Sequence, residues 1–142
     1  MTSDHGFDFD FDFEAMKAQG NAVDLPPLYV LTMTPLPMAS EPQPGPDGRT
    51  PLAIHYEYMH RMLEQGKLLL IGPCIGEPMT PGTAPVPPGF GILNVASREE
   101  AEEIARNEPF HAMGWRRNTV TPWTPKFGSL IETLREHQHG KS

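Results

Sequence analysis

Four stretches of the sequence have the composition and length of β-strands. Residues 28–34 (LYVLTMT) are rich in β-branched and apolar side chains and follow two prolines, which is typical of a strand. Residues 67–76, 89–96 and 116–123 also have strand-like compositions and are expected to form the other three strands. The run at 67–76 is almost continuously apolar, which predicts burial on both faces of its strand.

Two helices are expected between these strands. The first begins at Pro51, which follows an N-capping threonine, and it runs to about Gly66. The second spans 98–106 and begins with a capping box formed by Ser97 and Glu100. Without the chain ends, the order of elements is β-α-β-β-α-β, which is the split arrangement of ferredoxin-like folds.

This order predicts an α+β fold in which the two helices cover one face of a four-stranded antiparallel sheet. Apolar residues occur at both alternating positions of the strand segments YVL and LLLI, so the other face of the sheet also requires cover. A homodimer that stacks sheet on sheet would provide it. Long loops rich in proline and glycine are expected at 35–49 and 76–89.

The apolar positions of the first helix recur every three or four residues, as in a helix with one buried face. They are Leu52, Tyr56, Met59 and Leu63. His55 falls at the edge of this stripe, and His60 lies about 100° from Met59 around the helix axis. The helix therefore carries one histidine at the boundary of its predicted buried face.

The ends of the chain divide it into an N-terminal arm at 1–26, an α+β domain at 27–124 and a C-terminal tail at 125–142. Phenylalanine and aspartate alternate in the arm, so an extended chain would place the aromatic rings on one face. These residues are Phe7, Phe9, Phe11 and Phe13. The arm is either disordered or packed on its own domain or on a second subunit. The tail is expected to form a helix at 129–138, with Leu130, Ile131 and Leu134 on one side.

Charge and cysteine content narrow the class of protein. Five acidic residues and no Lys or Arg among residues 1–14 account for most of the formal net charge of −7. No basic stripe with interleaved aromatic residues is present, so a nucleic-acid partner is not expected. Cys74 is the only cysteine, which excludes an internal disulfide and fits a reducing compartment. The acidic N-terminus and the lack of a long apolar run predict a soluble cytoplasmic protein without a membrane span.

Glu108 precedes Pro109 where the second helix must end, because proline cannot continue a helix and restricts the residue before it. Glu108 therefore lies at a chain reversal. It is either a solvated residue at a helix end or a carboxylate directed at a partner across the fold. Composition alone does not distinguish these two possibilities.

The order of these segments resembles that of the YCII-related family, within the dimeric α+β barrel superfamily that includes muconolactone isomerase. The resemblance covers about residues 28–123. It rests on the strand LYV, the run HYEYMHRMLEQGKLLLIGP, the segment GILNVAS before an acidic helix, and EPFHAMGW followed by VTPW. The order and spacing of these pieces carry the resemblance.

The resemblance implies a catalytic pair of a histidine in the first helix and an aspartate in an Asp-Pro-aromatic motif after the second. By position before the Gly-Lys-Leu-Leu strand, His55 rather than His60 matches the histidine, and Glu108 occupies the position of the aspartate. This is a departure from the family pattern, because the extra methylene moves the carboxylate by about 1.5 Å.

A histidine and a carboxylate together support proton transfer, because imidazole titrates near neutral pH and a carboxylate can orient the ring. The resemblance implies an isomerase or lyase of aromatic or secondary-metabolite catabolism, with dehalogenase-like chemistry also open. Its substrate would be a small lactone-like or quinone-like compound, and it would need no cofactor or metal. The alternative is a small-molecule-binding or scaffold dimer without turnover, which is favoured if Glu108 does not reach His55.

Other residues are candidates for binding a substrate. His60 and His111 are expected to be accessory, and Trp115 either stacks on a flat ring or anchors the fourth strand. Arg116 and Arg117 could each hold a substrate carboxylate. Strand alternation allows only one of them to face inward, and the other is expected to solvate the surface.

Overall fold

The computed structural model describes residues 11–37, 48–75 and 86–137. Its centre is a four-stranded sheet with the order β2-β3-β1-β4, in which every neighbouring pair is antiparallel. The strands are β1 (Leu28–Pro35), β2 (Leu68–Pro73), β3 (Gly89–Leu93) and β4 (Arg116–Trp123). All four strands were predicted from the sequence, and the predicted α+β ferredoxin-like fold is confirmed.

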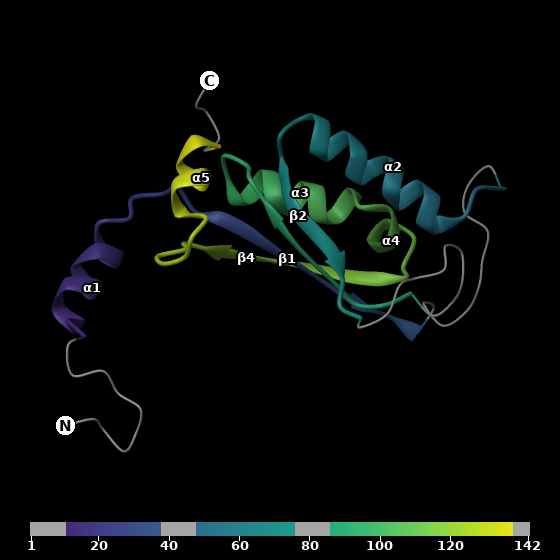
Figure 1. Cartoon of the computed structure of the whole chain (residues 1–142). Coiled ribbons are helices and arrows are strands. Elements are labelled where there is room, and N and C mark those ends of the chain that lie inside the picture. Colours follow the sequence, from purple (N-terminus) through teal and green to yellow (C-terminus); the bar gives the residue numbers. More distant parts are fainter. Residues whose placement is uncertain (1–10, 38–47, 76–85, 138–142) are drawn as a thin grey trace, which may run out of the picture.

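Helices α2 (Pro51–Glu64), α3 (Arg98–Asn107) and α4 (Pro109–Ala112) lie over one face of this sheet (Figure 1). The predicted N-caps are present: Ala53 N donates to Thr50 Oγ1 at 3.2 Å, and Glu100 N donates to Ser97 Oγ at 3.1 Å. The four-residue helix α4 was not predicted. No helix among the described residues is long and apolar enough to cross a membrane.

The hydrophobic core lies between the sheet and these helices. On β1, the alternate residues Tyr29, Leu31 and Met33 are buried in this core. On β4 the buried alternate residues are Arg116, Asn118 and Val120. Strand β4 therefore places two polar side chains at buried positions beneath the helices.

The buried face of α2 differs from the predicted stripe. Its buried side chains include Leu52, His55, Met59 and Met62. The predicted members Tyr56 and Leu63 are instead each 58% exposed. At the N-terminal end of this face Leu52 and His55 lie by Phe110 of α4, a helix absent from the sequence prediction, and farther along Met59 and Met62 pack in the main core. His55 therefore belongs to the buried face and does not lie at its edge.

The opposite face of the sheet is less covered than predicted. Leu70 on β2 is 61% exposed and Phe90 on β3 is 46% exposed, so β2 is not buried on both faces within one chain. Phe90 is paired with Thr32 across β1 and β3, and Ile92 is paired with Val30. This face presents a mixed apolar and threonine surface.

The described part of the N-terminal arm forms helix α1 (Phe13–Asn21) and not the extended chain that the sequence pattern indicated. Asp12 caps it by accepting a hydrogen bond from Ala15 N at 2.9 Å, so the alternating pattern ends in a helix. Phe11 and Phe13 are 55% and 61% exposed, and the burial expected for the arm is not found at these two residues. The remaining arm phenylalanines, Phe7 and Phe9, lie outside the described residues.

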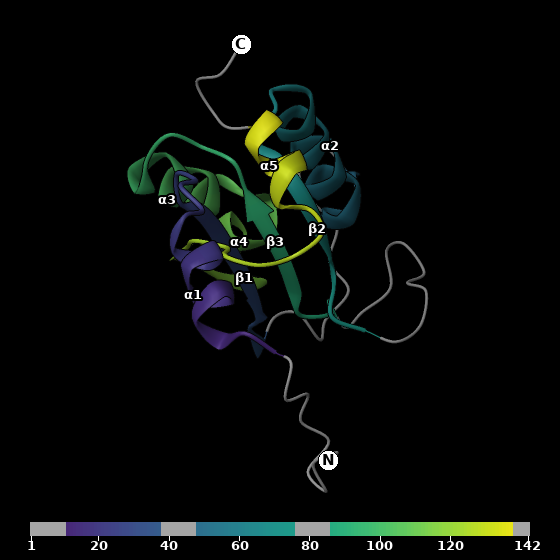
Figure 2. The same ribbon diagram turned by 60° about the vertical axis from the view of Figure 1, so that its left-hand side comes forward.

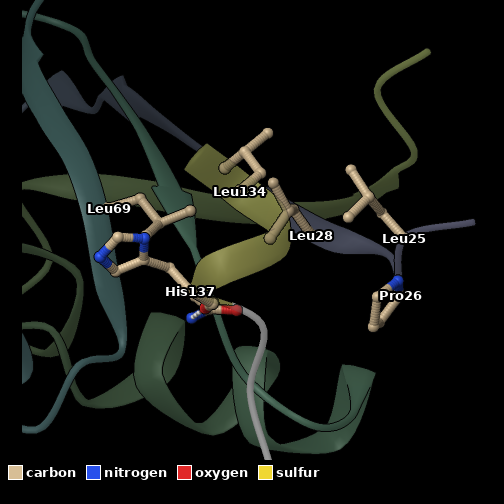
Figure 3. Close-up of a pocket in the computed structure, with 7 residues that line it drawn as sticks. Leu25, Pro26, Leu28, Leu69, Leu134 and His137 are labelled. Atoms are coloured by element: carbon tan, nitrogen blue, oxygen red, sulfur yellow. Dashed lines mark hydrogen bonds between the residues drawn. The ribbon is translucent and has the colours of Figure 1, made fainter. Parts of the chain in front are cut away.

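Helix α5 (Ile131–Glu136) is shorter than the predicted tail helix. Ile131 and Leu134 are partly buried, whereas Leu130 is 61% exposed. Figure 3 shows Leu134 beside Leu28, and the side chain of Asn94 donates to the His137 carbonyl at 2.6 Å. The hollow between these residues holds only about 10 Å³, which is room for roughly one water.

Figure 2 shows α5 in front of the strands and α4 behind them. Within α1, a Cβ added to Gly20 would lie 2.4 Å from Cζ of Phe127, so the absence of a side chain allows this close approach. The predicted division into arm, domain and tail stays a prediction.

Candidate active site

The inner face of α2 directs His55 toward the junction of α3 and α4. The His55 side chain is 8% exposed, and its Nδ1 lies 2.8 Å from Oε2 of Glu108. Glu108 is itself fully buried. The structure therefore brings together the two residues that the sequence analysis selected as a pair.

Glu108 has its position because of the proline that follows it. Its backbone is extended (φ −61°, ψ 128°), so it ends α3 and acts as the N-cap of α4. The same carboxylate accepts a hydrogen bond from Phe110 N at 2.7 Å through Oε2. The carboxylate before Pro109 thus caps a helix and also contacts His55 across the fold.

Asn118 completes the surroundings of this carboxylate. Its Nδ2 donates to Oε1 of Glu108 at 2.9 Å and to the Ala105 carbonyl at 2.9 Å. With His55 and Phe110, Asn118 gives the carboxylate three hydrogen-bond partners. The sequence analysis missed Asn118, although it has the same strand parity as Arg116 and so shares its inward face.

The orientation of the Asn118 amide follows from its neighbours. Oδ1 is buried and has no partner among the described residues. Exchanging the oxygen and nitrogen would direct Oδ1 at two acceptors, the Ala105 carbonyl and Glu108, which is less favourable than one unpaired acceptor. The amide therefore serves as a donor to Glu108.

These contacts set the charge of Glu108. Burial by itself raises the pKa of this carboxyl, but the hydrogen bond and charge of His55, followed by the bonds from Asn118 and Phe110, outweigh it. The net effect lowers the pKa below its usual value of 4.5, so Glu108 is ionised at neutral pH. An ionised carboxylate can only accept a hydrogen bond, so the neutral imidazole of His55 carries its hydrogen on Nδ1 and donates it to Glu108.

A cleft of about 510 Å³ opens beside this pair, between α2 and the β2 edge of the sheet. His55 lines it, and Nε2 of His55 makes no hydrogen bond to another described residue. Most of the lining is apolar and includes Met33, Leu52, Met59, Leu68 and Ile71. The cleft has the size of a small-molecule pocket, and a histidine with one nitrogen uncommitted stands in its wall.

Arg116 lines the same cleft from β4. It is only 3% exposed, whereas Arg117 is exposed on the other face of the strand. The prediction that one of these two arginines faces inward is therefore confirmed. Arg116 is the inward one, and it lies over the ring of Phe110 with 4.6 Å between Cζ and the ring centroid.

The other predicted binding residues are placed differently. His60 lines the cleft but is exposed and pairs with Glu64 on the same helix. His111 and Trp115 do not line the described cleft. The Nδ1 atom of His111 accepts from Asn118 N at 3.0 Å, and buried Trp115 stacks on Phe110 with 6.0 Å between ring centroids. Trp115 thus has the packing role that the sequence analysis left open.

Tyr58 connects α2 to α3 behind the pair. Its hydroxyl donates to the Ile104 carbonyl at 3.1 Å. Burial, followed by the negative charge of Glu108, raises the pKa of Tyr58 to about 12. Tyr58 therefore keeps its proton at neutral pH and acts as a structural donor. The described residues contain no group of three His, Cys, Asp or Glu side chains able to hold a metal ion.

Comparison with known proteins gives one family and a distant structural likeness. The model of the YCII-related domain matches residues 28–124, which is more than half of the chain. A search of curated proteins found no match. Among solved structures, the chain is similar to 5-chloro-2-hydroxyhydroquinone dehydrochlorinase from Burkholderia phenoliruptrix in complex with 2,5-dihydroxybenzoquinone. The TM-score is 0.43 and the identity 17%, over 68% of this chain and 93% of that one.

Proposed function

The chain belongs to the YCII-related domain family, and we propose that it is a cofactor-free enzyme that moves a proton on a small cyclic, carbonyl-activated substrate. The observation that carries this proposal is the buried His55–Glu108 hydrogen bond beside the cleft. A lactone-like substrate has a C–H bond that a neighbouring carbonyl makes acidic, and a quinone-like substrate has one in its non-aromatic keto tautomer. Isomerase or lyase chemistry on such a substrate requires only a placed base and acid.

In the proposed reaction, Nε2 of His55 removes a proton from the carbon next to the carbonyl, and the C–H electron pair passes into an enolate. Glu108 accepts the Nδ1 hydrogen bond throughout and stabilises the imidazolium that forms. The imidazolium then returns the proton to a different atom of the substrate, which completes an isomerisation. Alternatively, the enolate expels a leaving group, which gives a lyase reaction.

The contact between His55 and Glu108 favours this enzyme over a non-catalytic binding or scaffold dimer. The sequence analysis favours the binding or scaffold dimer only if Glu108 does not reach His55. Nδ1 of His55 and Oε2 of Glu108 are 2.8 Å apart, so this condition is not met. A fully buried carboxylate with three hydrogen-bond partners is also a rigid support for a catalytic ring.

A homodimer that stacks the two open sheet faces remains part of the proposal. Its support is the exposure of Leu70 and Phe90 on the face that α2, α3 and α4 leave uncovered. Phe90→Asp is expected to shift the protein toward monomer in sedimentation experiments, because a buried charge opposes apolar pairing. A wild-type protein that is monomeric at micromolar concentration would contradict the proposed dimer. The cytoplasmic location, which rests on sequence alone, stays a prediction.

The proposed reaction can be tested with α-angelica lactone, a small lactone whose isomerisation needs one proton removal and one return. NMR in D₂O would follow both isomerisation and deuterium uptake. His55→Asn is the informative variant, because an asparagine amide can replace the Nδ1 donor to Glu108 but supplies no base. We expect wild type and His60→Asn to catalyse exchange and His55→Asn to lose it.

Equal exchange rates in wild type and His55→Asn would contradict the proposed role of His55. A folded wild-type protein that accelerates exchange neither in this lactone nor in a lactone that carries a carboxylate would favour the binding module. Circular dichroism of each variant shows whether the fold is kept.

A further inference from the structure

Arg116 is a buried cation in the wall of the cleft, and its hydrogen bonds go to neutral groups. Its Nε donates to the Pro87 carbonyl at 3.0 Å, and its Nη1 lies 3.4 Å from Sδ of Met33. A thioether sulfur is a weak acceptor. No carboxylate among the described residues forms an ion pair with this guanidinium.

Glu108 is the nearest candidate for a partner, but its oxygens are engaged elsewhere. His55, Phe110 and Asn118 already contact them. Burial lowers the pKa of Arg116, and the charges of Glu108 and then Cys74 oppose that effect. The Glu108 charge thus acts on Arg116 without a hydrogen bond between them. A buried cation left in this state is costly, and a bound anion would relieve that cost.

We propose that Arg116 binds the carboxylate of a small planar substrate in this cleft. The carboxylate would be at one end of the substrate, and the carbon that His55 deprotonates would be at the other. The inference rests on the proposed function and names the class of its substrate, a ring that carries a carboxylate. A planar guanidinium is suited to a carboxylate because its N–H groups can donate in parallel to both oxygens.

Phe110 supports both functional side chains. The His55 ring centroid is 4.7 Å from that of Phe110, and Cζ of Arg116 is 4.6 Å from the same centroid. The base and the cation therefore have a common rigid neighbour, which limits the distance between them. A single substrate ring can reach both side chains.

The cleft also selects the body of the substrate. Its volume of about 510 Å³ suits a one-ring compound, and the side chains of Leu52, Met59 and Leu68 provide apolar walls. One fixed cation in an apolar cleft favours a molecule with a hydrophobic body and a single negative end. A neutral lactone or quinone would leave Arg116 without an anionic partner.

Binding of benzoate and benzamide tests this assignment without a known substrate. The two probes have nearly the same shape and differ in charge. Isothermal titration at low ionic strength would give both affinities for wild type, for Arg116→Gln and for the matched control Arg117→Gln. Arg117 is the exposed neighbour on the same strand, so the control removes the same formal charge from the other face.

Wild type and Arg117→Gln are expected to bind benzoate at least about tenfold more tightly than benzamide, as one charge-assisted hydrogen-bonded contact provides. In Arg116→Gln the two affinities are expected to agree within about twofold. No preference for benzoate in wild type, or an equal preference in Arg116→Gln, would overturn the inference.

Arg116→Gln is a substitution at a buried site, so a second measurement keeps the test decisive if this variant does not fold. In wild type, benzoate is expected to shift the Arg116 Nε–H resonance in ¹⁵N NMR more than benzamide does. An unshifted Arg116 resonance at saturating benzoate would also overturn the inference.

His55→Asn separates this inference from the proposed reaction. If Arg116 binds the carboxylate, His55→Asn keeps the benzoate preference even when it has lost proton exchange. Loss of that preference in a folded His55→Asn protein would place the anion at His55 and contradict the assignment to Arg116. A wild type that prefers benzoate but exchanges no proton of a lactone that carries a carboxylate would support the anion site and count against the proposed reaction.

Discussion

Two histidines on opposite sides of α2 each contact a glutamate, one pair buried and the other exposed to solvent. On the inner side, His55 contacts Glu108 with side-chain exposures of 8% and 0%. On the outer side, His60 contacts Glu64 with exposures of 67% and 65%. Both are pairs of one histidine and one glutamate, so the chemistry of the residues does not distinguish them.

Burial and the additional contacts of the carboxylate separate the two pairs. Glu108 is also bound by Phe110 and Asn118 and cannot leave His55 for water. Glu64 lies one helical turn from His60 and is exposed to solvent, which competes for both side chains. A fixed tautomer and orientation are therefore expected for His55 but not for His60.

Turnover should show the largest difference. With a substrate in hand, His55→Ala is expected to lower kcat by about 10²–10⁴-fold, the usual contribution of a general acid–base residue. His60→Ala changes a solvated side chain at the rim of the cleft and is expected to alter kcat by less than about tenfold. Steady-state kinetics measure both, and equal losses in the two variants would show that burial does not separate their roles.

Stability should differ next. Glu108→Ala leaves the buried donors of Phe110 and Asn118 without their acceptor, which is expected to cost about 3–5 kcal/mol of unfolding free energy. Glu64→Ala removes an exposed pair and should cost less than about 1 kcal/mol. Chemical denaturation measures both values. A Glu108→Ala protein as stable as Glu64→Ala would contradict the description of the inner pair.

The length of the carboxylate side chain gives a smaller effect. Glu108→Asp retracts the carboxylate by about 1.5 Å, so it cannot keep the bonds to His55, Phe110 and Asn118 without movement of the backbone. We expect a loss of about 1–3 kcal/mol in stability. Chemical denaturation measures this loss, and a Glu108→Asp protein as stable as wild type would contradict it.

The dependence of stability on pH tests the charge of Glu108. Its pKa is lower in the folded protein than the usual 4.5, so its ionised form contributes stability that is complete above about pH 4.5. This contribution is lost as the pH falls through the folded pKa. The stability difference between wild type and Glu108→Gln should therefore shrink in acid. A difference that stays constant from pH 7 to pH 3 would contradict the lowered pKa.

Much of the fold follows from local sequence signals. The strand at 116–123 and the caps Thr50 and Ser97 were predicted where the structure has them. Helix α4 was missed because four residues are too few to show helical periodicity. Helix α1 was missed because the Phe-Asp alternation suggested a strand, while Asp12 acts as a helix cap.

The site was only partly accessible from sequence. His55 and Glu108 were selected by the resemblance to a family, not by their local patterns. Asn118 could have been found by extending the inward parity of Arg116 by two residues. The buried face of α2 could not have been found in this way, because the predicted stripe and the observed one (Leu52, His55, Met59 and Met62) both recur every three or four residues. Tertiary packing therefore decides which histidine is fixed by a buried carboxylate.

The protonation of the His55 ring shows whether Glu108 holds His55 as a base, and measuring it needs no substrate. Long-range ¹H–¹⁵N NMR distinguishes the protonated nitrogen of an imidazole from the unprotonated one. At a pH where the ring is neutral, we expect hydrogen on Nδ1 of His55, a free lone pair on Nε2, and rapid tautomer averaging for exposed His60. Hydrogen on Nε2 of His55, or averaging like that of His60, would contradict the claim that Glu108 holds His55 as a base.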